Sequence, residues 1–288
     1  MTLNYRIEGE GAPLLLIHGV GVTFTIWKNL APLLRHHYKL IMVEMPGHGA
    51  SPALPYEANY YQGSAERLEL LRHDLRIEKW VVLGYSIGAW VAQAYLQRFP
   101  ERVSGVIFLC PGAITPPLSL SLNSMARLDS FFPELSDWLL QGRSLHLLVR
   151  LLGFNGRRHP YADLWTREIE SQPVHVIKSV LRDLPGNGRA PFTIPPCPAM
   201  VIWGAHDALT RWPRRLSPVD RVVNGAHSAP MNNAEDIARM IRSFDIRVEP
   251  PLHWEHNIFS TKGSFSIKGG VNLFLRLRAK INLRPPGF

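Results

Sequence analysis

Short apolar runs without charged residues constrain this chain more than any other feature. They cover residues 14–17, 40–43, 80–83, 103–109 and 199–203. Continuous apolarity, rather than alternation, is typical of strands that are covered on both faces, as in a parallel sheet. Between the runs, residues 59–75 carry leucines at three- and four-residue spacing, and a helical stretch over 87–99 ends before Pro100. The alternation predicts an α/β fold, a mostly parallel sheet with helices on both faces.

The strand–helix alternation stops after Pro111 and resumes at Pro198. The sequence between them reads as helices and loops without a strong strand, and its clearest helical stretch, 135–152, is interrupted at Gly142. We therefore expect a helical cap inserted into an α/β core. The expected boundaries are 1–112 and 191–244 for the core, 113–190 for the cap and 245–288 for a C-terminal extension.

The C-terminal extension differs in kind from the rest of the chain. Apolar residues alternate with mostly polar or basic ones over 271–283, which is the period of a half-buried strand. Gly269 and Gly270 could turn this strand back on residues 259–267 as a β-hairpin. The extension holds seven basic and three acidic residues, so it contributes +4 to the total net charge of +9. The remaining 244 residues carry +5, which is an ordinary charge for a globular protein.

The overall composition excludes several classes of protein. An aromatic share of 10% argues against global disorder, and two cysteines cannot form a disulfide framework. Both cysteines, Cys110 and Cys197, stand in apolar runs, so we expect buried thiols. No apolar run approaches the roughly 18 residues that span a bilayer, and no secretory signal is visible. We expect a cytoplasmic protein without a transmembrane segment, and no motif indicates nucleic-acid binding.

The residues Gly84-Tyr85-Ser86-Ile87-Gly88 fit the pattern Gly-x-Ser-x-Gly, between an apolar run and a helical stretch. A sharp strand-to-helix turn would strain the backbone of Ser86 and project its Oγ above the sheet, with room made by the glycines. The helix that follows would present free N–H groups and its positive dipole end to the reacting oxygen. The pattern predicts Ser86 as a nucleophile and the Ile87 N–H as one oxyanion donor.

Residues 1–244 resemble the α/β-hydrolase family. The resemblance rests on this turn, on His18-Gly19 after the first apolar run, and on the loop Pro46-Gly47-His48-Gly49. It implies that the Val20 N–H is the second oxyanion donor. Glu44 stands where the family usually has an aspartate before that loop.

The family order of serine, acid and histidine implies Asp207 as the acid and His227 as the base. Asp207 follows the apolar run 199–203, and His227 follows Val222 and Val223. The two are 20 residues apart, which is shorter than is usual in the family. No acidic residue occurs between 102 and 128, so the family's alternative acid position is empty.

Other histidines offer rival roles. His18 and His48 are expected to shape their loops through hydrogen bonds, and His206 to face away from the site if Asp207 faces it. The pair His253 and His256 could be half of a metal site, but no third ligand is evident. We expect no metal and no cofactor.

A serine at the turn, where some members of the family use an aspartate, favours acyl chemistry. The main hypothesis is a serine hydrolase that cleaves a carboxylic ester of a small molecule through an acyl-enzyme intermediate. An enol-lactonase, a C–C bond hydrolase or an acyltransferase could use the same groups. A small-molecule receptor without catalysis could be built on the same fold.

Two features bear on the substrate, and both leave alternatives open. The cap is expected to cover Ser86, and candidate pocket residues are Tyr85, Phe131, Phe132, Trp138 and Leu139, although an ordinary core role would suit each of the last four. Four arginines without an acidic residue among them occupy 141–160 and could bind an acidic acyl carrier or form a solvated helix face; they are Arg143, Arg150, Arg157 and Arg158. The sequence does not indicate the oligomeric state.

Overall fold

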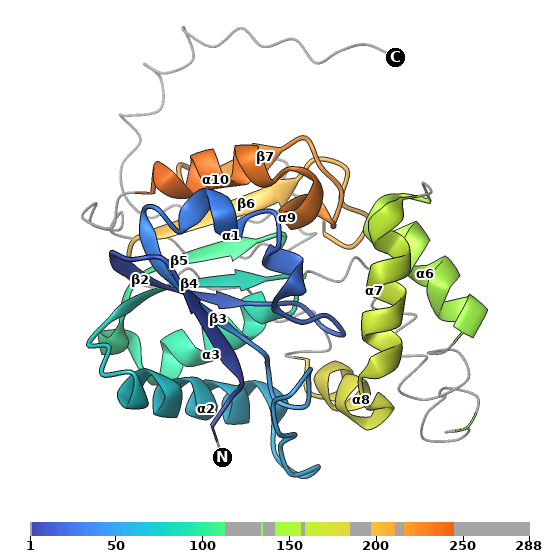
Figure 1. Ribbon diagram of the computed structural model, residues 1–288, viewed down its shortest axis with the longest axis horizontal. Coiled ribbons are helices and arrows are strands. Elements are labelled where there is room, and N and C mark those ends of the chain that lie inside the picture. Colours follow the sequence, from blue (N-terminus) through green and yellow to red (C-terminus); the bar gives the residue numbers. More distant parts are fainter. Residues whose placement is uncertain are drawn as a thin grey trace, which may run out of the picture.

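The computed structural model describes residues 2–112, 134, 142–156, 159–184, 197–210 and 216–244 (Figure 1). Its described strands form a seven-stranded sheet in the order β1-β3-β2-β4-β5-β6-β7. The edge strand β1 runs antiparallel to β3, and the other neighbours are parallel. The mostly parallel sheet is therefore confirmed. The strands are β1 (Tyr5–Glu8), β2 (Ala12–Ile17), β3 (Tyr38–Val43), β4 (Trp80–Tyr85), β5 (Val103–Leu109), β6 (Ala199–Gly204) and β7 (Asp220–Val223).

Helices cover both faces of this sheet (Figure 1). Helices α2 (Tyr60–Asp74) and α3 (Gly88–Arg98) lie on one face, and α1 (Ala31–Leu34) and α10 (Ala234–Arg242) lie on the other. In β2, Leu15 and Ile17 join the core under α2 and α3, whereas Leu14 and Leu16 join the core on the opposite face. All four are fully buried, which explains why the run is apolar without alternation. Each buried leucine stabilises the fold by roughly 2–3 kcal/mol.

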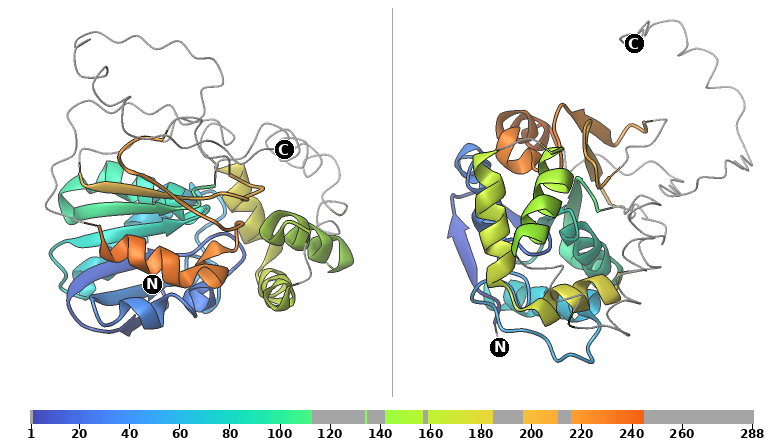
Figure 2. Two further views of the ribbon diagram at one scale, coloured as in Figure 1. Left: turned by 90° about the horizontal axis from the view of Figure 1, so that it is seen from above. Right: turned by 90° about the vertical axis from the view of Figure 1, so that its right-hand side faces the viewer.

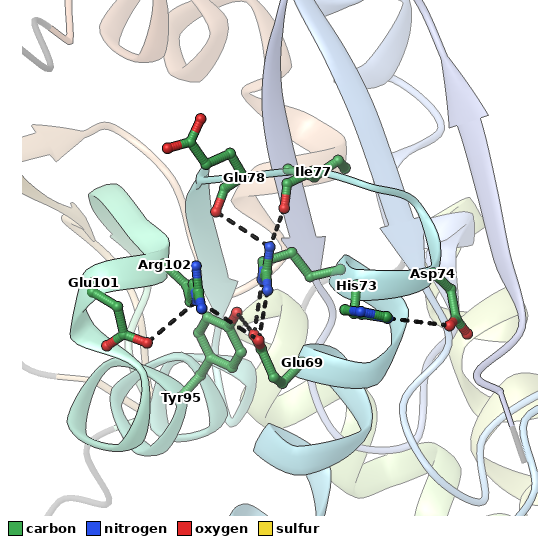
Figure 3. Close-up of polar contacts among 9 residues, drawn as sticks. Glu69, His73, Asp74, Ile77, Glu78, Tyr95, Glu101 and Arg102 are labelled. Carbon is green, nitrogen blue, oxygen red and sulfur yellow. Dashed lines mark hydrogen bonds and ion pairs between the residues drawn. The ribbon is translucent and has the colours of Figure 1, made fainter.

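A polar cluster joins α2 to α3 and to the loop before β4 (Figure 3). Arg72 reaches Glu69 through Nε at 2.9 Å and Nη2 at 2.6 Å, and its Nη1 donates to the carbonyls of Ile77 and Glu78. The Tyr95 hydroxyl of α3 donates to the same Glu69 carboxylate at 2.7 Å. Arg72 is nearly buried, so these partners compensate the loss of water around its charge.

Three helices of the described residues lie between β5 and β6 along the chain, within the segment predicted as an insertion. They are α6 (Gly142–Phe154), α7 (Pro160–Ser171) and α8 (Val174–Arg182), and they stand beside the sheet at one end (Figures 1 and 2). That end holds the carboxyl ends of the parallel strands, because α7 and α8 touch the loops that follow β2 and β3. Parallel α/β sheets place ligand chemistry at this edge.

The shorter elements are η1 (Phe24–Trp27), η2 (Pro100–Arg102) and α9 (Ala229–Asn232). The C-terminal extension at 245–288 lies outside the described residues. In the described part of the chain, no helix combines the length and apolarity needed to cross a bilayer. Both thiols are free; Cys110 is buried as predicted, but the prediction is wrong for Cys197, which is partly exposed where the chain enters β6.

Candidate active site

Ser86 stands at the sharp turn between β4 and α3, in the strained backbone conformation that its motif predicts. Its φ is +53°, in the left-handed region that non-glycine residues rarely adopt. A Cβ on Gly84 would lie 2.4 Å from the Gly88 carbonyl oxygen, and one on Gly88 would lie 2.5 Å from the His18 carbonyl oxygen. The turn closes so tightly that only glycine fits at these two positions.

The structure brings the three predicted side chains Ser86, His227 and Asp207 together. His227 Nε2 lies 2.8 Å from Ser86 Oγ, and His227 Nδ1 lies 2.7 Å from Asp207 Oδ2. The short link of 20 residues between the acid and the histidine therefore does not prevent contact. Ser86 is 6% exposed and His227 is 3% exposed, so the group is almost closed to solvent.

The carboxylate of Asp207 determines which nitrogen of the imidazole carries the proton. Burial acts to raise its pKa, but the charge and hydrogen bond of His227, together with hydrogen bonds from Thr210 and Leu209, hold the pKa below its ordinary value. The ionised carboxylate can only accept, so Nδ1 of the neutral imidazole donates to it. The Nε2 lone pair then faces the hydroxyl of Ser86 and can take its proton.

Tyr85, the residue before the serine, lies against His227. Its hydroxyl donates to the His227 backbone carbonyl at 2.7 Å, and the two rings lie 5.3 Å apart, tilted by 33°. The Tyr85 side chain is fully buried. It thus holds the main chain of the histidine in place through this hydrogen bond.

Two backbone amides in the loops around Ser86 make no hydrogen bond to another described residue. A Cβ on Gly19 would lie 3.0 Å from Ser86 Cβ, so the loop after β2 passes directly beside the serine. In the described part of the chain, neither the Val20 nor the Ile87 amide donates to an acceptor. Ile87 precedes α3, whose first N–H groups have no partner within the helix.

His18 and His48 hold the loops around these amides, as the sequence predicts. His18 Nε2 accepts from the Met45 amide at 2.9 Å, and His48 Nε2 accepts from the Gly21 amide at 3.1 Å. Burial lowers the pKa of His18 to about 3 and the pKa of His48 to about 4. Both rings are therefore neutral at pH 7, which lets them accept from backbone N–H groups.

His206 turns away from the group, as predicted, and contacts Asn224 Oδ1 at 2.9 Å. Trp165 of α7 is a neighbour that the sequence analysis did not single out: its buried indole ring lies 6.4 Å from the His227 ring. No pattern in the sequence distinguishes it, because only the folding of the insertion brings it to the histidine.

Several predicted residues lie outside the described part of the chain. They are the pocket candidates Phe131, Phe132, Trp138 and Leu139, the arginines Arg157 and Arg158, and the histidines His253 and His256. Arg150 donates to the Gly156 carbonyl at 3.2 Å, which engages one end of its guanidinium within the insertion. Among the described residues, no cluster of histidine, cysteine and carboxylate side chains could hold a metal ion.

Comparison with known proteins gives one family and several relatives. The family model of the alpha/beta hydrolase fold matches residues 12–224. An uncharacterized protein of Mycobacterium tuberculosis is 32% identical over 119 residues, which is 40% of this chain and only 34% of that protein's length. This chain thus spans about a third of the first curated relatives it matches.

Two further proteins match over most of their length. The pimeloyl-acyl-carrier-protein methyl ester esterase of Chromobacterium violaceum is 25% identical over 255 residues, which cover 84% of this chain and 97% of that enzyme. The solved structure of a thermophilic esterase from Thermogutta terrifontis has a TM-score of 0.66 and 23% identity, and the match covers 83% of this chain and 91% of that one. At that identity the structural likeness shows a shared fold.

Proposed function

The chain belongs to the α/β-hydrolase fold family, and from this membership we propose that it is a serine hydrolase that cleaves a carboxylic ester of a small molecule. One observation carries the proposal: Ser86 Oγ, the His227 imidazole and the Asp207 carboxylate form a continuous hydrogen-bonded chain at the carboxyl ends of the strands. The specific chemical consequence of this arrangement is that it activates the serine hydroxyl. A receptor that does not catalyse a reaction would have no need of it.

The proposed reaction begins when Ser86 Oγ attacks the carbonyl carbon of the ester. His227 Nε2 takes the serine proton, and the resulting imidazolium is stabilised by the Asp207 carboxylate. The carbonyl electron pair moves onto oxygen, and the amides of Val20 and Ile87 donate to this oxyanion. His227 then returns the proton to the alcohol as the C–O bond breaks, which leaves an acyl group on Ser86.

Water completes the cycle by the same route. His227 Nε2 removes a proton from the water, whose oxygen attacks the acyl carbon, and the second tetrahedral intermediate again places its oxyanion on the two amides. As this intermediate collapses, the bond between the acyl carbon and Ser86 Oγ breaks, His227 returns the proton to Oγ, and the acid is released. The near-complete burial of Ser86 and His227 supports the proposal, because charges act more strongly where water is excluded.

The relatives support an ester as the substrate class. The Chromobacterium violaceum protein is named as a methyl ester esterase whose acyl group is carried on an acyl carrier protein. We propose by analogy a small acyl ester for this chain, with an acidic acyl carrier as one form in which it could arrive. The helices α6, α7 and α8 would act as a cap over the acyl group.

The test compares the wild type with Ser86→Ala on p-nitrophenyl butyrate. We expect kcat to fall by at least about 10³-fold, because the remaining oxyanion donors cannot replace the nucleophile. The control is Ser243→Ala, which removes an exposed hydroxyl just after α10 that donates to the Met240 carbonyl. Equal rates for the wild type and Ser86→Ala would refute the proposal.

A fluorophosphonate probe separates the alternatives. We expect mass spectrometry to find the probe on Ser86. Labelling without ester hydrolysis would favour an enol-lactonase, a C–C bond hydrolase or an acyltransferase, which a lactone panel and alcohol or amine acceptors distinguish. Failure to label Ser86 in folded protein would favour the receptor.

A further inference from the structure

Helix α7 is tied to the loop that carries the Val20 amide, here called the oxyanion loop and defined as residues 18–25. We propose that Glu168 of α7 is a positioning residue for this loop, and that the pair α6 and α7 braces the reacting groups rather than only covering them. The inference rests on the proposed function, in which the Val20 amide stabilises the oxyanion.

The Glu168 carboxylate accepts hydrogen bonds from Thr23 and Thr25 at the end of the oxyanion loop. Its Oε1 accepts from the hydroxyl of Thr23 at 3.1 Å and from the hydroxyl of Thr25, and its Oε2 lies 3.4 Å from the Thr23 amide. A carboxylate that accepts from several donors at once binds them more strongly than a neutral acceptor would. Glu168 is 145 residues from Thr23 and 143 residues from Thr25 in the sequence, so the contact joins two distant parts of the chain.

The residue after Glu168 touches the middle of the same loop. Gly21 has a φ of +73°, and a Cβ added to it would lie 2.7 Å from Ile169 Cγ1. On its other side, the Gly21 amide donates to His48 Nε2 at 3.1 Å. The residue next to Val20 is therefore held between α7 and a buried histidine of the core.

The same helix pair is tied to the loops of the acid and the base. Asn155, between α6 and α7, donates from Nδ2 to the carbonyl of His206 at 2.7 Å, beside Asp207. The amide of Ser228, beside His227, donates to the Gly153 carbonyl at 3.2 Å. The loops that carry Val20, Asp207 and His227 are thus each hydrogen-bonded to α6, to α7 or to the turn between them.

These ties matter because an oxyanion donor acts only when it is aimed correctly. A shift of about 1 Å in a reacting group can lower the rate about 100-fold. The Val20 amide lies three residues before Thr23, so releasing the end of the loop allows the amide to move. The ester carbonyl of the ground state needs this amide less than the oxyanion does, so the loss should appear in kcat rather than in KM.

The experiment uses the full chain and three variants: Glu168→Gln, Thr25→Val and the control Glu170→Gln. The first weakens the acceptor, the second removes one donor, and the third changes an exposed carboxylate two residues along the same helix. The substrate is p-nitrophenyl butyrate. A trifluoromethyl ketone probes the oxyanion directly, because Ser86 Oγ adds to its carbonyl carbon, the serine proton passes to His227, and the carbonyl oxygen becomes the oxyanion.

We expect Glu168→Gln and Thr25→Val each to lower kcat about 5- to 30-fold with KM changed less than 2-fold. The ketone inhibition constant should rise by a similar factor, the rate of fluorophosphonate labelling should fall, and Glu170→Gln should match the wild type. Thermal unfolding must show that each variant is folded at the assay temperature, and Thr25→Val decides the question if Glu168→Gln is not. Unchanged kcat, or a loss of kcat without weaker ketone binding, would overturn the inference. Because the wild type must first hydrolyse the ester and label at Ser86, failure of the proposed function is seen separately.

Discussion

Replacing Asp207 with asparagine tests the proposed role of the acid more sharply than deleting it. Asp207 Oδ1 accepts from the amides of Leu209 at 2.8 Å and Thr210 at 3.1 Å, while Oδ2 faces His227 Nδ1. In Asp207→Asn the amide oxygen must take the Oδ1 position, because an NH2 group there would face two N–H donors. The new NH2 group then points at His227 Nδ1.

This orientation inverts the tautomer of the imidazole. Nδ1 must accept from the asparagine, so the ring proton moves to Nε2, which then faces Ser86 as a donor and cannot take its proton. Loss of the correct tautomer in such a triad lowers kcat by about 10⁴, which corresponds to about 5.4 kcal/mol of transition-state stabilisation. We expect this loss for p-nitrophenyl butyrate at pH 7.5, with little change in KM.

The control is Asp236→Asn, which changes a carboxylate on the exposed side of α10 that pairs with Arg239 at 3.2 Å. It should keep the wild-type rate. A folded Asp207→Asn protein that retains kcat within 10-fold of the wild type would refute the reasoning. The hydrogen-bonded acid would then be a structural partner of His227 only.

Three further substitutions test buried hydrogen bonds, two of them beside the site and one between α2 and the loop before β4. Tyr85→Phe removes the hydroxyl that donates to the His227 carbonyl, so we expect urea unfolding to show a loss of about 1–3 kcal/mol in the free energy of unfolding. A variant as stable as the wild type would contradict this role of the hydroxyl. Burial lowers the pKa of His48 to about 4, so between pH 6.5 and 4 this ring is neutral in the folded protein but binds a proton in the unfolded chain. His48→Gln should therefore reduce the loss of stability on acidification by up to about 1.4 kcal/mol per pH unit in that range. If urea unfolding at several pH values gave the same dependence of stability on pH for the variant and the wild type, the prediction would be wrong. Arg72→Met leaves Glu69 without its main cation and the carbonyls of Ile77 and Glu78 without this donor. We expect thermal unfolding to show that the variant is less stable by about 3 kcal/mol. A loss below about 1 kcal/mol would mean that water replaces the arginine.

Patterns that depend on burial and on turn geometry were predictable from the sequence. The five apolar runs all fall in strands, and the helices expected over 59–75 and 87–99 are α2 (Tyr60–Asp74) and α3 (Gly88–Arg98). A strand that is covered on both faces needs apolar side chains at every position, so its own sequence is enough to predict it. The left-handed Ser86 was equally predictable, because the glycines around it leave few other turns.

Contacts that depend on tertiary folding gave no such signal. Strand β1 (Tyr5–Glu8) is four residues long and has an exposed face, so its composition resembles that of a loop. The ties of Glu168 to Thr23 and Thr25 cross more than 140 residues, and an exposed-looking glutamate on an amphipathic helix has no feature that marks its partner. Cys197 sits in an apolar run yet is partly exposed, because its run begins before the strand enters the sheet.

The role of each buried histidine follows from its hydrogen-bond partners rather than from its residue type. The chain has 12 histidines, and His18 and His48 are as deeply buried as His227. Yet His18 Nε2 accepts from the Met45 amide, so a proton on that nitrogen would face another N–H donor, and burial would oppose the added charge. His227 Nε2 faces a hydroxyl that can give up a proton, and the Asp207 carboxylate on Nδ1 stabilises the cation that results. Burial suppresses protonation of His18 and His48, and both accept from backbone N–H groups. His227 is the ring that joins a hydroxyl to a carboxylate, so it is the ring suited to act as the base.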